Sequence, residues 1–223
     1  MTETAHHDFL GMLTEEETRA LHARGGTRRF RRGAVMLREG EEPTRVLVLL
    51  EGRAKAITYT DEAREVVLGF MGPGELLGEV AAIEERPRSA TVVALEPVTA
   101  LALANRDFWG LLDEHPRIWI VVHKTVIGRL RLADLQRKEF AGSNALGRVA
   151  RRLLELSDRH GVEEEDGVTI TLPLTQEELA GWTGASRESV TKALRTLREL
   201  GWIETRRRAI AVRDRESLRR FAR

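Results

Sequence analysis

Two groups of residues in this sequence have the types and spacing that recognise phosphates. The first is the glycine-rich segment 72–79, which is followed nine residues later by Arg88, Ser89 and Ala90. A glycine-rich turn that enters a short helix presents backbone N–H groups to an anion. Arg88 can bind a phosphate through two N–H groups, and Glu79 can accept from a ribose hydroxyl or brace Arg88. This pattern predicts a sugar-phosphate site, and an ordinary structural turn with a Glu–Arg pair is the alternative interpretation.

The second group lies in residues 175–194, where two helix-forming segments flank Gly184. Thr175 with Glu178 forms a capping-box pattern, and Ser186 can cap the second helix. The first residues of a second helix in this arrangement reach base edges in the major groove of DNA. The side chains that we expect to contact bases or phosphates there are Thr175, Ser186, Arg187, Glu188, Ser189 and Lys192. An ordinary three-helix bundle with solvated charges is the alternative.

The charge distribution supports a polyanionic partner for the C-terminal end. Residues 1–142 carry 20 basic and 22 acidic side chains, whereas residues 173–223 carry 12 basic and 7 acidic ones. Arg206, Arg207 and Arg208 stand between two short apolar segments that predict a hairpin. We therefore expect a basic wing over DNA phosphates.

The elements that must position these residues change in kind along the chain. Residues 27–104 alternate short apolar runs with glycines, which predicts six or more strands in an all-β barrel or sandwich. The acidic run 163–166 is expected in a turn, and a strand is expected at 168–172. Helices are expected at 9–24, 106–113, 117–140, 144–160, 175–183 and 186–200, with a short basic helix at the C-terminus.

The long helix 117–140 carries two apolar stripes. One is a heptad-like seam spaced 4, 3, 4 and 3 residues apart, formed by Trp119, His123, Val126, Leu130 and Ala133. The other, Ile120, Val121 and Ile127, is expected to cover the barrel. Two stripes imply two partners, so we expect this helix to join two copies of the chain. A helix buried within one globule is the alternative.

Composition excludes several classes of protein. The chain has no cysteine, which removes disulfides, cysteine-ligated zinc and iron–sulfur clusters. Its six histidines have no metal-binding spacing, and we expect no metal and no haem. No apolar run reaches the length of a membrane helix, and residues 1–8 lack the features of a secretory signal. We expect a cytoplasmic protein with no catalytic residues.

Taken in order, these motifs resemble the cyclic AMP receptor protein (CRP/FNR) family of bacterial transcription regulators. The residues that carry the resemblance are 33–40, 47–52, 73–79, 88–90, 147–150 and 185–190, so that it extends over about residues 10–212. The resemblance implies an α+β chain in three parts. These are a double-stranded β-helix (jelly-roll) barrel of the cyclic-nucleotide-binding type over residues 1–116, a dimerisation helix and hinge over 117–142, and a winged helix-turn-helix over 143–223.

The resemblance also implies function. It implies a homodimer that binds an inverted repeat in double-stranded DNA, contacts RNA polymerase, and is gated by a cyclic nucleotide, cyclic AMP before cyclic GMP or another ligand. The residues expected around the nucleotide are Gly78, Glu79, Val80, Arg88, Ser89, Ala90, Ala133 and Asp134. Ala133 and Asp134 replace hydroxyl or amide side chains that meet adenine in the family. Lys192 stands where Arg is common. A regulator that needs no ligand, or one gated by a different small molecule, is the alternative.

Overall fold

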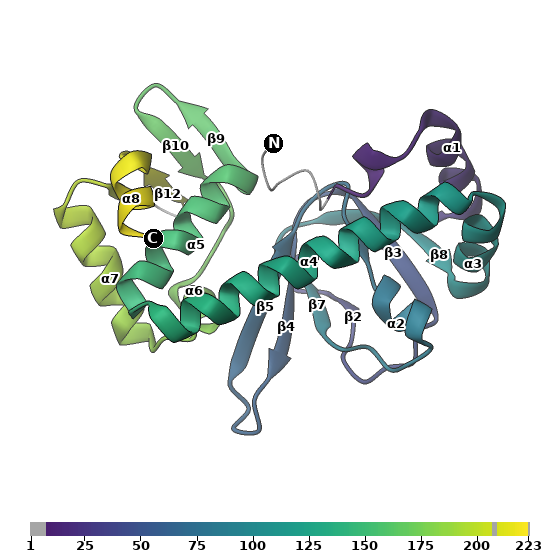
Figure 1. The fold of residues 1–223 in the computed structure, drawn as a ribbon, viewed down its shortest axis with the longest axis horizontal. Helices are drawn as coiled ribbons and strands as arrows, with labels where there is room; N and C mark the ends of the chain where they lie inside the picture. The colour runs from purple at the N-terminus through teal and green to yellow at the C-terminus, as the bar shows by residue number, and fades with distance from the viewer. Residues whose placement is uncertain (1–7, 207–208, 223) are drawn as a thin grey trace. The chain divides into compact units, whose positions relative to one another are not determined.

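The computed structural model describes residues 8–206 and 209–222, and the chain divides into two compact units. The first unit comprises Met1–Thr58 and Leu68–Ala133, and the second comprises Tyr59–Val67 and Asp134–Arg223. Figure 1 follows the chain through both. None of the helices among the described residues is long and apolar enough to cross a membrane.

Two four-stranded sheets form the barrel near the N-terminus. One has the strand order β1 (Gly26–Phe30), β8 (Val98–Ala104), β3 (Arg45–Glu51) and β6 (Leu76–Leu77). The other has the order β2 (Val35–Leu37), β7 (Thr91–Ala94), β4 (Ala54–Tyr59) and β5 (Glu65–Met71). The sequence-based prediction of a barrel made of short strands is therefore confirmed.

Strand β3 is the centre of this unit because both of its faces are buried. Successive side chains of a strand point to opposite faces, so a continuous apolar run fits a strand covered on both sides. Leu47 and Leu49 pack into the barrel interior with residues of the second sheet. Val46 and Val48 pack on the other face, in a cluster with helical residues.

Helices cover that outer face. They are α1 (Glu15–Arg24), α3 (Asn105–Glu114) and the first part of α4 (Pro116–Gly142). Thr14 and Glu17 form a capping box at the start of α1, so this helix begins later than the expected 9–24, and residues 10–12 form a separate 3-10 helix. Phe108 and Ile118 are fully buried in the resulting core.

The second unit packs helices on another antiparallel sheet. Its strands lie in the order β11 (Ile203–Arg206), β12 (Ala209–Val212), β10 (Gly167–Ile170) and β9 (Gly161–Glu164). Its helices are α5 (Ala145–His160), α6 (Gln176–Thr183), α7 (Arg187–Glu199) and α8 (Arg215–Phe221). The side chain of Asn144 accepts a hydrogen bond from the N–H of Gly147 and so caps α5, which fits the helix expected at 144–160.

One expectation about this unit is correct for only two of four residues, since Glu165 and Asp166 form the turn. The acidic run 163–166 was expected to lie in a turn, whereas Glu163 and Glu164 belong to strand β9. Glu163 pairs with Val168, and Glu164 pairs with Gly167, in an antiparallel hairpin. Pairing with the buried strand β10 outweighs the low strand propensity of glutamate.

Candidate functional site

The glycine-rich segment of the first unit leads from β6 into the short helix α2 (Glu79–Glu84). Gly78 stands immediately before this helix with a φ of 82°, in the left-handed region that favours glycine. A Cβ atom on Gly78 would clash with Nη1 of Arg88. The backbone conformation therefore favours glycine at this position, and a Cβ atom would also displace the Arg88 guanidinium.

Arg88 is almost completely buried, with 5% of its surface exposed. Its Nη1 donates to the carbonyl oxygen of Gly78 at 2.8 Å, and its Nη2 donates to the carbonyl oxygen of Arg45. Burial lowers the pKa of Arg88, and the nearby positive charge of Arg45 lowers it further, whereas Glu79 and Glu41 oppose the shift. Among the described residues, Arg88 has no ion pair within 4 Å. A buried cation that only carbonyls satisfy is suited to receive an anion.

The sequence-based reasoning missed a second arginine at this site. Nη1 of Arg129, on α4, lies 2.5 Å from Oε1 of Glu79, whose exposed fraction is 1%. Nη2 of Arg129 donates to the carbonyl oxygen of Leu76 at 2.5 Å and lies 3.8 Å from Oε2 of Glu75. The signal was its position one helical turn before Ala133, on the same face of the long helix.

This contact corrects one interpretation of Glu79. The sequence offered either a hydrogen bond to a ribose hydroxyl or a brace for Arg88. The ion pair of Glu79 is with Arg129, a residue of α4 that lies 50 positions away in the sequence. The two arginines thus have separate partners, Arg88 two backbone carbonyls and Arg129 a carboxylate.

The other residues expected around the nucleotide are more exposed to solvent than Arg88 and Glu79. Val80 and Ala90 are half-buried, and Ser89 is exposed. The backbone of Arg88 is tied to the loop after β2, because its N–H donates to Glu41 and its carbonyl accepts from Gly40, both at 2.9 Å.

Two further expected residues lie on α4. Ala133 is exposed. Asp134 is also exposed, and its Oδ1 lies 3.8 Å from Nη1 of Arg137. A contact between either residue and a purine base stays a prediction.

The apolar stripes of α4 are arranged differently from the expectation. Val121 is buried against the barrel core as expected, but Ile120 and Ile127 are 57% and 47% exposed. Trp119 and Val126 instead pack against the core that Val121 joins. Helical periodicity explains the correction, because the core-facing side of α4 is centred on Val121 and Val122. The exposed apolar residues of α4 in this unit are Ile120, Ile127 and Leu130.

In the second unit, α6 and α7 form a helix–turn–helix. The side chains of Thr175 and Glu178 cap α6 reciprocally, and Gly184 ends the helix with a φ of 57°. The hydroxyl of Ser186 accepts from the N–H of Ser189 and caps α7. Apolar residues of both helices, Leu179, Ala180, Val190 and Leu194, are buried.

The start of α7 exposes the side chains expected to read bases. Arg187, Glu188 and Lys192 are exposed, and Ser189 is half-buried. A hydrogen bond from its own backbone N–H, with a second one from the Ser186 hydroxyl, lowers the pKa of Glu188. Glu188 therefore stays ionised at neutral pH and can accept a hydrogen bond from an amine of a base.

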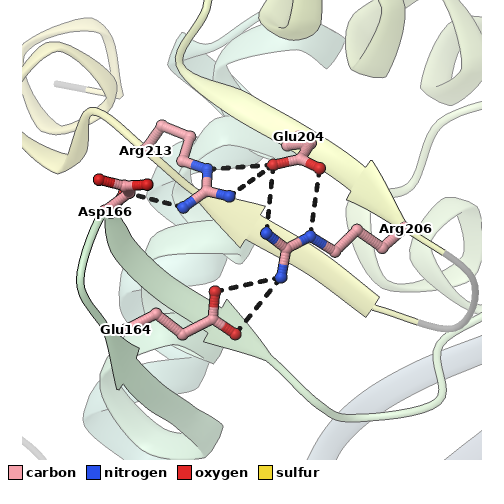
Figure 2. A network of polar contacts seen from close by, with 5 residues as sticks. All are labelled: Glu164, Asp166, Glu204, Arg206 and Arg213. Atoms are coloured by element: carbon pink, nitrogen blue, oxygen red, sulfur yellow. Dashed lines mark hydrogen bonds and ion pairs between the residues drawn. The ribbon is translucent and has the colours of Figure 1, made fainter.

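The expected wing is the hairpin of β11 and β12, and only part of it is described. Arg207 and Arg208 lie outside the described residues. Arg206 is described, and its guanidinium lies against Glu204 and Glu164 rather than standing free (Figure 2).

Comparison with known proteins agrees with these two units. Residues 27–115 match the family model of the cyclic nucleotide-binding domain, and residues 147–221 match that of the Crp-like helix-turn-helix domain. The chain is 31% identical over 194 residues to a CRP-like cAMP-activated global transcriptional regulator of Mycobacterium tuberculosis, with 87% of each protein covered. It is 29% identical to the cyclic AMP receptor protein of Thermus thermophilus, covering 96% of this chain and 95% of that one.

Solved structures show the same fold. A CRP-family transcriptional regulator from Thermus thermophilus aligns with a TM-score of 0.75 at 27% identity, over 87% of this chain and 96% of that one. The c-di-GMP-responsive global regulator CLP of Xanthomonas campestris aligns with a TM-score of 0.79 at 22% identity, over 89% and 99% of the two chains.

A cyclic-nucleotide-binding barrel, a long helix and a helix–turn–helix together define a DNA-binding transcription regulator rather than an enzyme. The chain belongs to the CRP/FNR family.

Proposed function

We propose that this regulator acts as a homodimer that is gated by a cyclic nucleotide, with cyclic AMP as the effector. The observation that carries the proposal is the buried guanidinium of Arg88, which two carbonyl oxygens hold next to Gly78. A cyclic phosphate would replace these carbonyls as the partner of Arg88. A phosphate carries a full negative charge that the carbonyl oxygens lack, so the pairing of two opposite charges favours the ligand in this exchange.

The ribose would lie beside Glu79, whose buried carboxylate can accept from its hydroxyls. Because Glu79 already pairs with Arg129, a bound ribose would share or displace a contact that reaches α4. Ligand binding would in this way be coupled to the helix that we propose as the dimer interface. Names of the relatives support cyclic AMP, since the Mycobacterium tuberculosis and Thermus thermophilus proteins are both named for it.

The proposed dimer interface consists of the exposed apolar residues of α4, Ile120, Ile127 and Leu130. They are spaced seven and three residues apart, which is the a/d pattern of a two-stranded coiled coil. This interface keeps Leu130 of the expected seam and has Ile120 and Ile127 in place of Trp119 and Val126, which pack against the core. A two-fold dimer would present two α7 helices to an inverted repeat, with half-sites about 34 Å apart.

On this proposal the protein works in the cytoplasm, where it meets DNA and RNA polymerase. The proposed parts are residues 1–116, 117–142 and 143–223. Contacts of Thr175, Ser186, Arg187, Glu188, Ser189 and Lys192 with the operator belong to the same proposal. The second candidate is a regulator with another effector, which the c-di-GMP-responsive relative in Xanthomonas campestris illustrates.

Titration calorimetry tests the gating. Cyclic AMP, cyclic GMP and c-di-GMP are titrated separately into the wild type, Arg88→Ala and Arg86→Ala. Arg86 is an exposed arginine two residues away, so its variant makes the same charge change outside the site. Binding of cyclic AMP that is lost only in Arg88→Ala supports the proposal. Preference for either other nucleotide supports the second candidate, and binding unaffected by Arg88→Ala contradicts the site.

A further inference from the structure

Arg206 stands at the end of β11 with its guanidinium engaged on two sides by carboxylates (Figure 2). Its Nε lies 3.1 Å from Oε1 of Glu204, and its Nη2 lies 3.4 Å from Oε2 of the same residue. Its Nη1 lies 3.1 Å from Oε2 and 3.4 Å from Oε1 of Glu164, on β9. All three nitrogens of this guanidinium therefore already donate to carboxylates.

The contacts continue to a second arginine. Oε2 of Glu204 accepts from Nη2 of Arg213 at 2.5 Å and from its Nε at 3.2 Å, and Nη1 of Arg213 donates to the carbonyl oxygen of Asp166 at 3.0 Å. Hydrogen bonds from Arg213 and then from Arg206 lower the pKa of Glu204. The carboxylate thus stays ionised at neutral pH. Two arginines and two glutamates compensate one another, so this network adds no net charge to the wing.

A phosphate oxygen would bind Arg206 through the same N–H groups. A nucleic acid can use Arg206 only if it displaces Glu204, Glu164 or both. Binding to DNA backbone is dominated by the number of phosphates that cations neutralise, and this number sets non-specific affinity. A wing arginine that is held by carboxylates contributes less to the affinity for any duplex. A larger share of the binding free energy then comes from the base-reading helix α7.

We propose that Glu164 and Glu204 are intramolecular competitors of DNA phosphate for Arg206, and that they limit the non-specific DNA affinity of this regulator. The inference rests on the proposed DNA binding and on the contact of the wing with DNA phosphates that the sequence predicts. It gives a role to the acidic run of β9, which neither the ligand site nor the helix–turn–helix uses. The same geometry would also suit a surface ion pair that only joins the two hairpins, so the test must measure DNA binding.

The test compares Glu164→Gln and Glu204→Gln with Glu165→Gln. Glu165 lies in the same hairpin, is exposed, and has no ion pair among the described residues, so its variant removes the same charge without freeing Arg206. Binding to a fluorescein-labelled duplex of random sequence is followed by anisotropy over a series of salt concentrations. The wild type and Lys192→Ala, a variant of α7, are measured in parallel.

We expect Glu164→Gln and Glu204→Gln to bind the random duplex several-fold more tightly than Glu165→Gln does. Combining the two should steepen the dependence of log affinity on log salt by about 0.9, the value of one additional phosphate contact. Adding Arg206→Ala should cancel this gain. Thermal unfolding of each variant, followed by circular dichroism, verifies that the hairpins remain folded, and Glu164→Gln leaves the Glu204–Arg213 contact in place.

Three results would overturn the inference. The first is a gain in Glu164→Gln and Glu204→Gln no larger than in Glu165→Gln. The second is a gain in Glu164→Gln that survives Arg206→Ala, since the ion pair of Glu164 is with Arg206 whereas Glu204 also holds Arg213. The third concerns Arg206→Ala as a single substitution. If it alone made the dependence of log affinity on log salt shallower by about 0.9, Arg206 would already contact a phosphate in the wild type. These three results would leave the proposed DNA binding intact. If no wing residue contributed to the affinity of the wild type for the duplex, the contact of the wing with DNA would itself be refuted.

Discussion

Arg129 on α4 and Glu79 at the start of α2 form an ion pair, with Nη1 2.5 Å from Oε1, although 50 residues separate them in the sequence. The pair fixes the carboxylate that we assign to the ribose. It also makes the long helix part of the proposed nucleotide site. A change in either residue should therefore affect ligand binding without touching the phosphate contact at Arg88.

We predict that Arg129→Gln weakens cyclic AMP binding about tenfold, equivalent to about 1.4 kcal/mol, because the carboxylate of Glu79 loses the partner that orients it. Arg129→Lys should restore little of the lost affinity. An ammonium lacks the fixed fork of a guanidinium and cannot contact both Glu79 and the Leu76 carbonyl. Arg131→Gln, two residues along the helix and exposed, is the control. Calorimetry measures all three, and equal affinities for Arg129→Gln and Arg131→Gln would exclude a role for the ion pair.

The exposed side of α4 gives a prediction about assembly. Leu130→Glu should raise the dimer dissociation constant at least about 100-fold, because burial of one leucine contributes about 1.5–3 kcal/mol and a two-fold interface contains it twice. Leu68→Glu makes the same substitution on β5, where the leucine is 45% exposed compared with 61% for Leu130. Sedimentation equilibrium compares the two. If Leu130→Glu left the dimer intact, this face of α4 would not be the dimer interface.

The sequence predicts the local elements well because each has a signal within a few residues. The predicted caps at Thr175 and Ser186 both form, and Thr14 and Asn144 cap their helices in the same way, since a cap needs only a hydroxyl or amide three residues before the N–H that it accepts from. Gly184 ends α6 in the left-handed conformation for a similarly local reason.

Features that depend on distant partners could not be predicted in this way. The ion pair of Arg129 with Glu79 depends on how α4 crosses the barrel, which periodicity does not specify. The pairing of Arg206 with Glu164 depends on the order of four strands in the sheet, across 42 residues. The apolar stripes of α4 were assigned one residue out of phase because Trp119 and Ile120 are equally apolar, and only the core shows which of them it covers.

Base recognition by α7 gives a third prediction. Arg187→Ala should weaken binding to a selected operator by about 1–3 kcal/mol and relax the choice of base at one position in each half-site. Arg219→Ala removes an exposed arginine of α8 and should leave base preference unchanged. Selection from a pool of random duplexes, followed by sequencing, measures both. If Arg187→Ala recovered the same consensus as the wild type, α7 would not be the recognition helix.

Arg152 holds the end of α4 against α5 in the second unit. Its side chain is 4% exposed and lies 2.5 Å from Oε2 of Glu139, contacts Glu155, and stands over the ring of Trp182 at 5.0 Å. Arg151 contacts the other oxygen of Glu139 at 3.2 Å but is 38% exposed. The two neighbouring arginines therefore share a carboxylate and differ in burial, which makes them a matched pair.

We predict that Arg152→Ala lowers the free energy of opening of α5 by about 3–5 kcal/mol, the usual cost of removing one partner of a buried ion pair. Arg151→Ala should cost about 1 kcal/mol or less, as for exposed pairs. Amide hydrogen exchange in α5 measures both. Similar losses in the two variants would show that burial does not set the strength of this contact.

The loss in Arg152→Ala should also depend on pH. Burial raises the pKa of Glu139, and Arg152 is the strongest influence that opposes the rise. Without Arg152 the pKa of Glu139 in the folded protein rises further above its unfolded value, so the folded state binds the proton more tightly. Stability from such a group is present below the unfolded pKa and is lost as pH rises through the folded pKa. The penalty of Arg152→Ala should therefore shrink as pH falls from neutral towards about 4, the unfolded pKa of glutamate. A penalty that stayed constant or grew over this range would mean that Glu139 is not the group left unpaired.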